Sequence, residues 1–348
     1  MQLHSITDAK REITVVSATD DGYAMPLAVT IRSILDHLAS DRRLRLYVLD
    51  GGLSDANKDR LLKSWNDPRI SVEWIGTDMA LVGDLFISEQ VNVVTYLRLL
   101  MARLLPKHVT RAIYIDADML VRRDLGQLWD EEQGPHAVLA VQDIAAPYID
   151  AAVALPRFEE SRSHLCAITP IKNYRDLGLS PKAAYFNGGL LVANIEQWRR
   201  EKYAEQMLDC LRTHREHILW WDQYALNIVL AGRWRSLDPR WNQNAHIYAF
   251  PSWRNSPLDR ESFYGVRRAP WIVHFCSPSK PWQCFCPHPF TRPFYRCLDC
   301  TDWRGWRPER PDNFWHKWWD FHYRPLQKKW KTNVRSAKQL IRGKRRAA

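Results

Sequence analysis

The sequence predicts an α/β protein built around a parallel sheet, and two observations support this prediction. Short apolar runs typical of buried strands alternate with segments in which apolar residues recur at helical spacing. Such alternation gives parallel strands joined by right-handed crossovers. One run, residues 112–115, leads directly into Asp116-Ala117-Asp118. Because open α/β sheets bind ligands at the carboxyl ends of their strands, these carboxylates also predict where a site lies.

The first part of the chain supplies five predicted strands, each apolar and too short for a helix. They cover residues 12–18, 44–49, 70–75, 112–115 and 138–141. The segments that follow the first, second and fourth strands, 19–23, Asp50 and Asp116, are expected to face one crevice.

Helices are predicted between these strands. The first buries one face made of Leu27, Ile31, Ile34, Leu35 and Leu38. The second is capped by Ser54 and buries Leu61, Leu62 and Trp65. A third covers residues 95–105 and ends before Pro106, and a short helical turn covers residues 125–129.

The second part of the chain is less regular. Over residues 144–183 the periodicity fades into a mixed segment that contains proline, which predicts a lid or an excursion over the site. An apolar strand at 185–194 then leads into a helix capped by Asn194, and Trp220 opens another helix. A last strand covers residues 271–275.

The net charge of +11 is concentrated at one end of the chain. Residues 315–348 hold eleven Lys and Arg and one Asp, so the remainder is nearly neutral. Nucleic-acid binding through this basic, Trp-rich tail is one alternative, which the neutral body disfavours. The first residues show no secretory signal, and no stretch approaches the roughly 20 apolar residues of a membrane span. Seven cysteines without an export signal predict a reducing, cytoplasmic location.

Two carboxylates placed two residues apart repel each other, so Asp116 and Asp118 need a cation, an opposite charge or bulk water. A solvated acidic turn is the alternative to a metal site, but the apolar segments on both sides favour the metal. Hard oxygen ligands suit Mg²⁺ or Mn²⁺. The sequence has no glycine-rich dinucleotide motif and no Walker loop, which disfavours ordinary dinucleotide or ATP binding.

The cysteines near the C-terminus raise the question of a zinc site. They are Cys284, Cys286, Cys297 and Cys300. A Cys-x-Cys pair fits the usual zinc spacing poorly, and free cysteines also pack well as small apolar residues. Both readings stay open, with packing the more frequent outcome.

Five blocks in this order resemble glycosyltransferase family 8. They are Thr19-Asp20-Asp21-Gly22-Tyr23, Ile115-Asp116-Ala117-Asp118, Phe186-Asn187-Gly188-Gly189, Asp222-Gln223 and His274 with Lys280-Pro281-Trp282. The resemblance implies a GT-A fold with a Rossmann-like mixed sheet flanked by helices. It also implies a UDP-hexose donor, Mn²⁺ or Mg²⁺ as cofactor, and transfer with retention of anomeric configuration. It places a catalytic domain at 1–302, with a donor half at about 12–143, an acceptor half at about 144–302, and a tail at 303–348.

The resemblance also implies a role for individual residues. The metal ligands would be Asp116, Asp118 and His274. The donor would lie against Thr19, Asp20, Tyr23, Arg98, Ala117 and Lys280, with Asp20 and Tyr23 at the uracil and ribose and Lys280 at the diphosphate. The donor sugar and the acceptor hydroxyl would be surrounded by Asp143, Asn187, Asp222 and Gln223.

Some features depart from the family pattern, and others stay open. Gly22 stands where relatives often carry Asn, and Ser277 replaces a common glycine in the loop after His274. The segment 144–183 does not match the galactosyltransferases well, so the resemblance does not identify the acceptor.

Asp222 and Gln223 either hold the sugar and stabilise an oxocarbenium-like state, or the leaving phosphate deprotonates the acceptor in a front-face displacement. A nucleotidyltransferase is the alternative enzyme, but no glycine-rich loop follows the first strand.

The C-terminal tail predicts a membrane contact. Aromatic residues between Phe314 and His322 form one face, and residues 326–348 combine an apolar helical stripe with basic residues beside it. Such a segment suits the surface of an anionic bilayer, which fits a glycan or lipid-linked acceptor at the inner face of the membrane. The alternative is that the aromatic part packs on the catalytic domain. We expect residues 303–319 to dock there and 326–348 to meet lipid.

Overall fold

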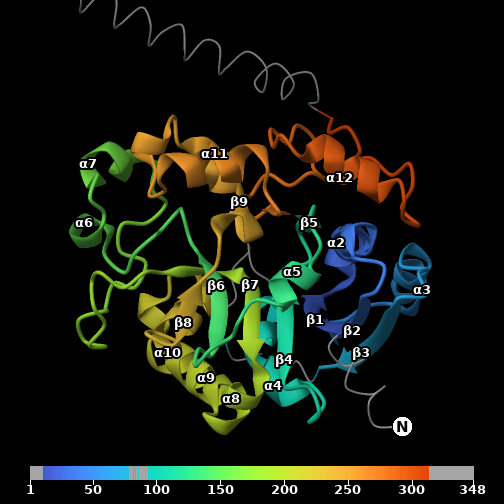
Figure 1. Cartoon of the computed structure of the whole chain (residues 1–348), viewed down its shortest axis with the longest axis horizontal. Coiled ribbons are helices and arrows are strands. Elements are labelled where there is room, and N and C mark those ends of the chain that lie inside the picture. The colour runs from blue at the N-terminus through green and yellow to red at the C-terminus, as the bar shows by residue number, and fades with distance from the viewer. Residues whose placement is uncertain (1–10, 78–80, 82, 84, 86–92, 313–348) are drawn as a thin grey trace, which may run out of the picture.

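The computed structural model describes residues 11–77, 81, 83, 85 and 93–312. A seven-stranded sheet forms the centre of the molecule, with helices on both faces (Figure 1). Its strand order is β3-β2-β1-β4-β7-β6-β8. The tail predictions for residues 314–348, including the membrane segment 326–348, lie outside the described residues.

The four predicted N-terminal strands are confirmed and run parallel. They are β1 (Glu12–Thr19), β2 (Arg43–Asp50), β3 (Ile70–Gly76) and β4 (Arg111–Ile115). The 3-10 turn η1 (Asp21–Tyr23) and helix α2 (Ala24–His37) follow β1, and α3 (Asp55–Ser64) follows β2. Ser54 caps α3 as predicted, accepting a hydrogen bond from the backbone N–H of Asn57.

The other half of the sheet mixes strand directions. Strand β6 (Val138–Gln142) is parallel to β8 (Trp234–Ser236), whereas β7 (Phe186–Asn194) lies between β4 and β6 and is antiparallel to both. The parallel arrangement predicted from alternation is therefore confirmed for β1 to β4, whereas β7 runs antiparallel to its neighbours. The mixed sheet that the family resemblance implies is confirmed.

Smaller elements connect and cover these strands. Between β4 and β7 lie β5 (Met119–Val121), α5 (Gly126–Trp129), α6 (Ala151–Ala154), α7 (Phe158–Ser161) and η4 (Arg162–His164). After β7 come α8 (Ile195–Arg200), α9 (Tyr203–Thr213), η5 (Arg215–His217), α10 (Trp221–Val229), η6 (Pro239–Asn242), β9 (Gln243–Asn244), η7 (Ala245–Ala249), η8 (Trp253–Asn255), α11 (Arg260–Arg268), β10 (Ile272–His274) and α12 (Thr291–Leu298). A second sheet has the order β5-β10-β9.

Two hydrophobic cores lie on opposite faces of the main sheet. Successive residues of β1 alternate between them, since Val15 belongs to one core and Val16 to the other. Helices α8, α9 and α10 pack into the core of Val16, whereas α2, α3 and α12 pack into the core of Val15. Each core contains strands from both halves of the chain, so the sheet is the common support for everything at its carboxyl edge.

Two helix predictions need correction. Leu62 is exposed, because neighbouring helical positions point about 100° apart and α3 already buries Leu61 and Trp65. The predicted helix over residues 95–105 is mostly a 3-10 helix, η3 (Val93–Leu100), which continues as α4 (Met101–Leu104). The apolar spacing identified the buried face but does not separate these two helix types.

The C-terminal part of the described chain packs against α3 and the core beneath it. Trp303 is buried, and the guanidinium of Arg60 on α3 lies 4.0 Å from the centre of its ring. Trp306 is partly exposed. Docking of the tail is thus confirmed at Trp303. Within the described ranges, no helix is long and apolar enough to cross a membrane.

Candidate active site

Asp116 and Asp118 lie on a turn whose backbone is held by hydrogen bonds to a side chain of α2. The turn joins β4 to β5, and Thr30 of α2 donates its hydroxyl proton toward the backbone oxygens of Ala117 and Met119, 2.7 and 2.8 Å away. The backbone N–H of Met119 donates to the same hydroxyl at 3.1 Å. A buried threonine therefore sets the direction in which Asp116 and Asp118 leave the sheet.

Strand pairing brings His274 to this turn from far along the chain. Strand β10 runs antiparallel to β5, and its register places His274 opposite Met119. Its Nε2 lies 3.3 Å from a carboxylate oxygen of Asp118 and 3.6 Å from one of Asp116. One ligand atom from each of the three residues falls within 4.8 Å of the others. The structure thus brings together the three predicted metal ligands.

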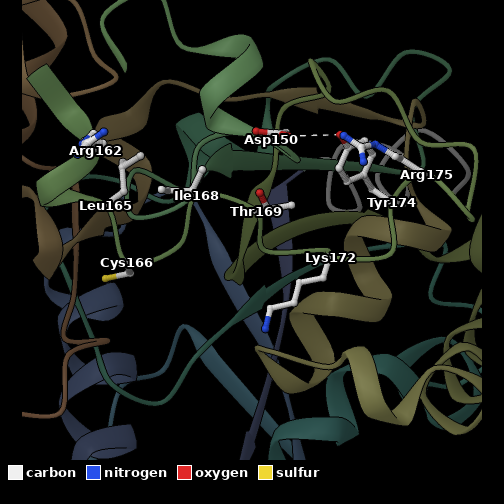
Figure 2. Close-up of a pocket in the computed structure, with 9 residues that line it drawn as sticks. All are labelled: Asp150, Arg162, Leu165, Cys166, Ile168, Thr169, Lys172, Tyr174 and Arg175. Carbon is white, nitrogen blue, oxygen red and sulfur yellow. Dashed lines mark hydrogen bonds between the residues drawn. The ribbon is translucent and has the colours of Figure 1, made fainter. Parts of the chain in front are cut away.

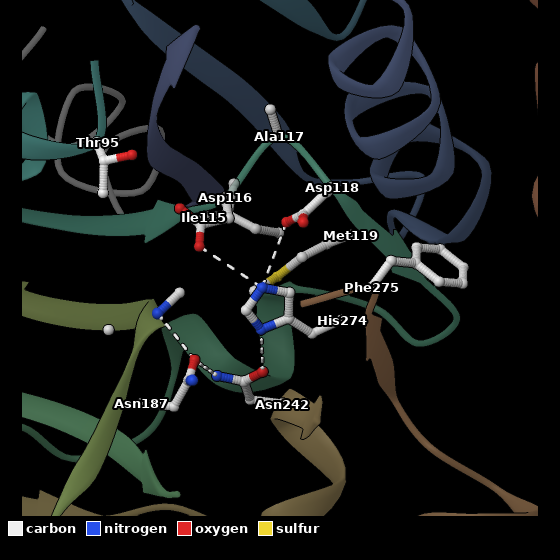
Figure 3. Close-up of polar contacts among 12 residues, drawn as sticks. Thr95, Ile115, Asp116, Ala117, Asp118, Met119, Asn187, Asn242, His274 and Phe275 are labelled. Atoms are coloured by element: carbon white, nitrogen blue, oxygen red, sulfur yellow. Dashed lines mark hydrogen bonds and ion pairs between the residues drawn. The ribbon is translucent and has the colours of Figure 1, made fainter. Parts of the chain in front are cut away.

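Asn242 fixes the orientation and the tautomer of His274 (Figure 3). The side-chain N–H of Asn242 donates to Asn187 at 3.0 Å, so its oxygen faces Nδ1 of His274, also at 3.0 Å. Nδ1 therefore carries the proton and donates it to Asn242. The lone pair of Nε2 is left facing two carboxylates, an arrangement that is repulsive unless a cation lies among them.

The buried Arg98 and the half-buried Lys280 neutralise the acidic pair. Arg98 of η3 contacts Asp116 at 2.9 Å, and Lys280 contacts Asp118 at 2.6 Å. Burial alone would raise the pKa of Asp118, but the charge of Lys280 beside it holds that pKa well below its usual range. Asp118 is therefore held in the ionised form that metal binding requires.

The absence of a side chain at Gly189 makes room for this cluster. A Cβ at Gly189 would collide with the His274 ring, and it would stand 2.8 Å from a carboxylate oxygen of Asp116. Gly188 is less confined, since the nearest atom to a Cβ there is a methyl carbon of Leu226 at 3.1 Å. Glycine at 189 is required by close packing, because its φ is not left-handed.

A chain of side-chain amides connects the metal cluster to Asp143. Asn187 accepts from Asn242 and donates to Asp143 at 3.1 Å. Gln223 donates to the same carboxylate oxygen of Asp143 at 3.1 Å and accepts from the backbone N–H of Gly188 at 3.0 Å. The predicted residues Asp143, Asn187 and Gln223 therefore form one network next to the metal ligands.

Asp222 is buried beside Arg98 rather than joined to that network. Its carboxylate lies 3.0 Å from Nε of Arg98, so Arg98 bridges Asp116 and Asp222. Burial raises the pKa of Asp222 to about 6, against the opposing charge of Arg98. The preceding residue, Trp221, has a left-handed φ of 35°, so local backbone strain accompanies the start of α10.

The residues predicted for the nucleotide lie at the end of β1. Asp20 caps η1 by accepting from the backbone N–H of Tyr23 at 3.1 Å. Tyr23 is partly exposed and contacts Trp282 edge-to-face, with the ring centres 5.7 Å apart. Thr19 is buried, and its backbone oxygen accepts from Gly51 at 2.8 Å. Asp50 was expected to face the crevice. Its carboxylate instead accepts hydrogen bonds from the backbone of its own turn and forms an ion pair with Lys58, 2.7 Å away.

The positions that depart from the family pattern have ordinary local contacts. Gly22 would place a Cβ 3.3 Å from the Asp20 carboxylate, and the Ser277 hydroxyl donates to the backbone oxygen of Ser279 at 2.8 Å. The four C-terminal thiols contact four different backbone oxygens. These are the pairs Cys284–Glu309, Cys286–Ser279, Cys297–Val29 and Cys300–Arg296.

Three residues of the site were missing from the sequence analysis. Thr30 carried a signal, since it is a polar residue on the apolar face of α2. Asn242 and Asn244 had none, because the segment that contains them lacks periodicity and lies about 30 residues before His274. Asn244 donates to Asp143 at 3.3 Å, and its place beside His274 depends on the pairing of β9 with β10.

Comparison with known proteins gives a consistent result. The family model described as "Glycosyl transferase family 8" matches residues 14–286. General stress protein A of Bacillus subtilis is 28% identical over 292 residues, which cover 83% of this chain and 94% of that protein. Lipopolysaccharide 1,3-galactosyltransferase of Salmonella typhimurium is 25% identical over 213 residues, which cover 60% of this chain and 55% of that protein.

Solved structures resemble the chain in fold. The galactosyltransferase LgtC, in complex with donor and acceptor sugar analogs, aligns with 88% of this chain and 100% of its own, with a TM-score of 0.67 and 22% identity. The bifunctional glycosyltransferase WbbM aligns with 84% of this chain and 50% of its own, with a TM-score of 0.68 and 25% identity. The mixed sheet and its flanking helices are thus those of the GT-A fold.

Proposed function

Because the chain belongs to glycosyl transferase family 8, we propose that it is a metal-dependent retaining hexosyltransferase. It transfers glucose or galactose from a UDP-sugar to a glycan or lipid-linked acceptor. One observation carries this proposal: the lone pair of His274 Nε2 faces the carboxylates of Asp116 and Asp118, with the imidazole held in place by Asn242.

The residues present fit a divalent cation. Two ionised carboxylates and one imidazole nitrogen suit Mn²⁺, and Mg²⁺ is the alternative. Asp116, Asp118 and His274 would hold the ion and leave its remaining positions to the diphosphate of the donor. A cation there stabilises the negative charge that develops on the departing nucleoside diphosphate.

Lys280 and Tyr23 define the donor side of the site. The ammonium of Lys280 donates to Asp118 and to the backbone oxygen of Phe275, each at 2.6 Å. This position allows Lys280 to stabilise the diphosphate together with the metal. Tyr23 and Trp282, at the end of β1 and after Lys280, supply aromatic surfaces for the uracil and ribose, with Asp20 beside them.

The amide network supports the sugar-binding role of Asp143 and its neighbours. Asp143 accepts from Asn187, Gln223 and Asn244, so its carboxylate is fixed in direction before any sugar arrives. Gln223 and Asp222 follow each other at the start of α10, where they would flank the donor sugar. Arg98, whose guanidinium nitrogens already have partners, would act by positioning Asp116 and Asp222.

A membrane contact completes the proposal. The basic, Trp-containing residues 326–348 would attach the enzyme to an anionic membrane at its cytoplasmic face. This location suits a lipid-linked acceptor, and it agrees with the lipopolysaccharide transferases among the relatives.

The test is turnover of UDP-hexoses with and without EDTA. We expect hydrolysis or transfer from UDP-glucose or UDP-galactose that EDTA abolishes and Mn²⁺ restores. The product, examined by NMR, should keep the anomeric configuration of the donor. Synthesis of a nucleotide sugar from a sugar phosphate and a nucleoside triphosphate would instead identify a nucleotidyltransferase.

A further inference from the structure

The segment between β6 and β7 forms a pocket of about 650 Å³ that none of the roles above uses. Its lining residues surround one space, with Arg162 and Cys166 on one side and Asp150, Tyr174 and Arg175 on the other (Figure 2). All nine lining residues lie between 150 and 175, within the irregular segment 144–183.

The pocket is positively charged. It presents Arg162, Lys172 and Arg175 against one carboxylate, Asp150. Arg162 is paired with Glu159 at 3.3 Å, so the net charge comes from Lys172 and Arg175. That carboxylate is already engaged, because it accepts from the Tyr174 hydroxyl at 3.3 Å and from the backbone N–H of Ala152 at 3.1 Å. Within the described part of the chain, the side chains of Lys172 and Arg175 have no carboxylate partner, and Arg175 stacks on Tyr174. Unpaired cations around a concave space favour an anion.

Backbone hydrogen bonds and a buried tyrosine hold the walls of the pocket in place. The backbone N–H groups of Asp150 and Ala151 donate to Pro181 and Ile168, each at 2.9 Å. Tyr174 is buried, and Arg175 lies next to it. The tyrosine ring thus fixes the cationic side of the pocket, which limits the entropy lost when a ligand binds.

Two hydrogen bonds connect the pocket to the sugar-binding network. Asp143 accepts from the backbone N–H of Ala145, and the backbone oxygen of Ala145 accepts from Cys166, both at 2.8 Å. On the same side, the Cys166 sulfur lies 3.5 Å from His246, whose backbone N–H donates to Asn244. Cys166, in the wall of the pocket, is therefore connected to Asp143 by hydrogen bonds through a single intervening residue, Ala145.

We propose that this pocket binds an anionic group of the acceptor, either a phosphate or a sugar carboxylate, while the acceptor hydroxyl lies near Asp143. The proposal rests on the function proposed above. The volume accommodates a sugar residue, and Lys172 and Arg175 supply charge-assisted hydrogen bonds. An acceptor that carries a phosphate or a uronic acid would thus be selected over a neutral glycan.

Cys166 allows binding to be measured without turnover. Its thiol is exposed in the pocket, whereas that of Cys300 is exposed elsewhere and serves as an internal reference. Alkylation of the full chain by N-ethylmaleimide is followed by peptide mass spectrometry with glucose 6-phosphate, glucuronate, inorganic phosphate or neutral glucose present. At a probe concentration about ten times its dissociation constant, alkylation of Cys166 should slow about tenfold while that of Cys300 stays constant.

The test variant is the double substitution Lys172→Ala with Arg175→Ala, and Lys182→Ala is the matched control, an exposed lysine outside the pocket. We expect the double variant to lose the protection and the control to keep it. Protection by glucose 6-phosphate alone would identify a phosphorylated acceptor, and protection by glucuronate alone a uronic acid. Equal protection by neutral glucose or by inorganic phosphate, no protection at all, or protection that survives in the double variant would overturn the proposal.

Donor hydrolysis separates the pocket from the proposed function. The double variant should hydrolyse UDP-hexose in the presence of Mn²⁺ at the wild-type rate, because neither residue belongs to the donor site. A wild-type protein that hydrolyses no UDP-hexose but shows Cys166 protection would contradict the transferase proposal and leave an anion pocket. Normal hydrolysis without protection would contradict only the pocket.

Discussion

His274 shows how much of the site depends on a single amide. The side-chain oxygen of Asn242 accepts a hydrogen bond from Nδ1 of His274, and its side-chain N–H donates one to Asn187. Outer partners of this kind set the tautomer and direction of a ligating histidine. Asn242 lies in η6, an element with no sequence signal for a metal site, so its role follows only from the structure.

Asn242→Leu should lower the affinity for Mn²⁺ about 10- to 100-fold, because the imidazole would lose its fixed tautomer. Asn242→Asp keeps an acceptor for Nδ1 and should retain more of that affinity than Asn242→Leu. Titration calorimetry of Mn²⁺ in the presence of UDP measures both. Asn66→Leu, at an exposed position in the loop between α3 and β3, is the control. Equal affinities for Asn242→Leu and wild type would rule out the orienting role.

Asp222 makes stability depend on pH in a defined direction. Burial raises its pKa from 3.8 to about 6, so the native state holds this proton more tightly than the unfolded chain does. The stabilising contribution is therefore complete below pH 3.8 and is lost as the pH rises through about 6. Above that pH the native state contains a buried carboxylate whose desolvation Arg98 offsets only in part.

Asp222→Asn, which cannot titrate, should gain stability relative to wild type as the pH rises from 4 to 7.5. The difference in the free energy of unfolding should grow by up to about 3 kcal/mol, since one pKa unit corresponds to about 1.4 kcal/mol. Urea unfolding at both pH values in EDTA measures it. A difference that does not change with pH would show that the pKa of Asp222 is the same in the native and unfolded states.

At the scale of elements, β7 combines two functions. It fills the sheet between β4 and β6, and its first residues supply Asn187, Gly188 and Gly189 to the site. The strand was predictable from its apolar run, but its direction was not. Side-chain alternation is the same for parallel and antiparallel strands, and the irregular segment 144–183 does not define a simple crossover.

Gly189→Ala should abolish measurable Mn²⁺ binding, because the added methyl group would occupy the space of the His274 ring and press on Asp116. Overpacking of this kind also costs about 1–3 kcal/mol of stability. Gly188→Ala is the matched control and should bind Mn²⁺ nearly as well as wild type, since its nearest neighbour is a flexible leucine. Melting temperature and metal titration of both variants decide the matter. Normal metal binding by Gly189→Ala would mean that the cluster is looser than its packing indicates.

At the scale of the whole molecule, the site joins segments that lie far apart in sequence. The carboxylates, Asn187 and His274 were predictable because each stands in a short motif next to an apolar strand. Thr30, Asn242 and Asn244 were not, since their contribution depends on the packing of α2 and on the register of the small sheet. The sequence also did not predict the pocket that contains Lys172 and Arg175. An exposed cation carries no sequence pattern that shows which other residues lie beside it in the fold.

Deleting residues 326–348 should separate catalysis from membrane binding. The nine basic residues between 328 and 346 should attract anionic vesicles, with about 1 kcal/mol for each cation near the surface. The truncated protein should therefore stay in the supernatant with anionic vesicles at low salt, while full-length protein sediments. Activity on a water-soluble acceptor should be unchanged. Equal sedimentation of the two proteins would assign the basic tail to another partner.

The metal-dependent donor site that we propose at Asp116, Asp118 and His274 is tested most directly by thermal unfolding with Mn²⁺ and UDP. Ligands present at about 100 times their dissociation constant stabilise the native state by about 2.7 kcal/mol, so the melting temperature of the wild-type protein should rise by several degrees. Asp118→Asn should fold, as judged by circular dichroism, and show no such rise. An equal rise in Asp118→Asn, or none in the wild-type protein, would contradict the assignment.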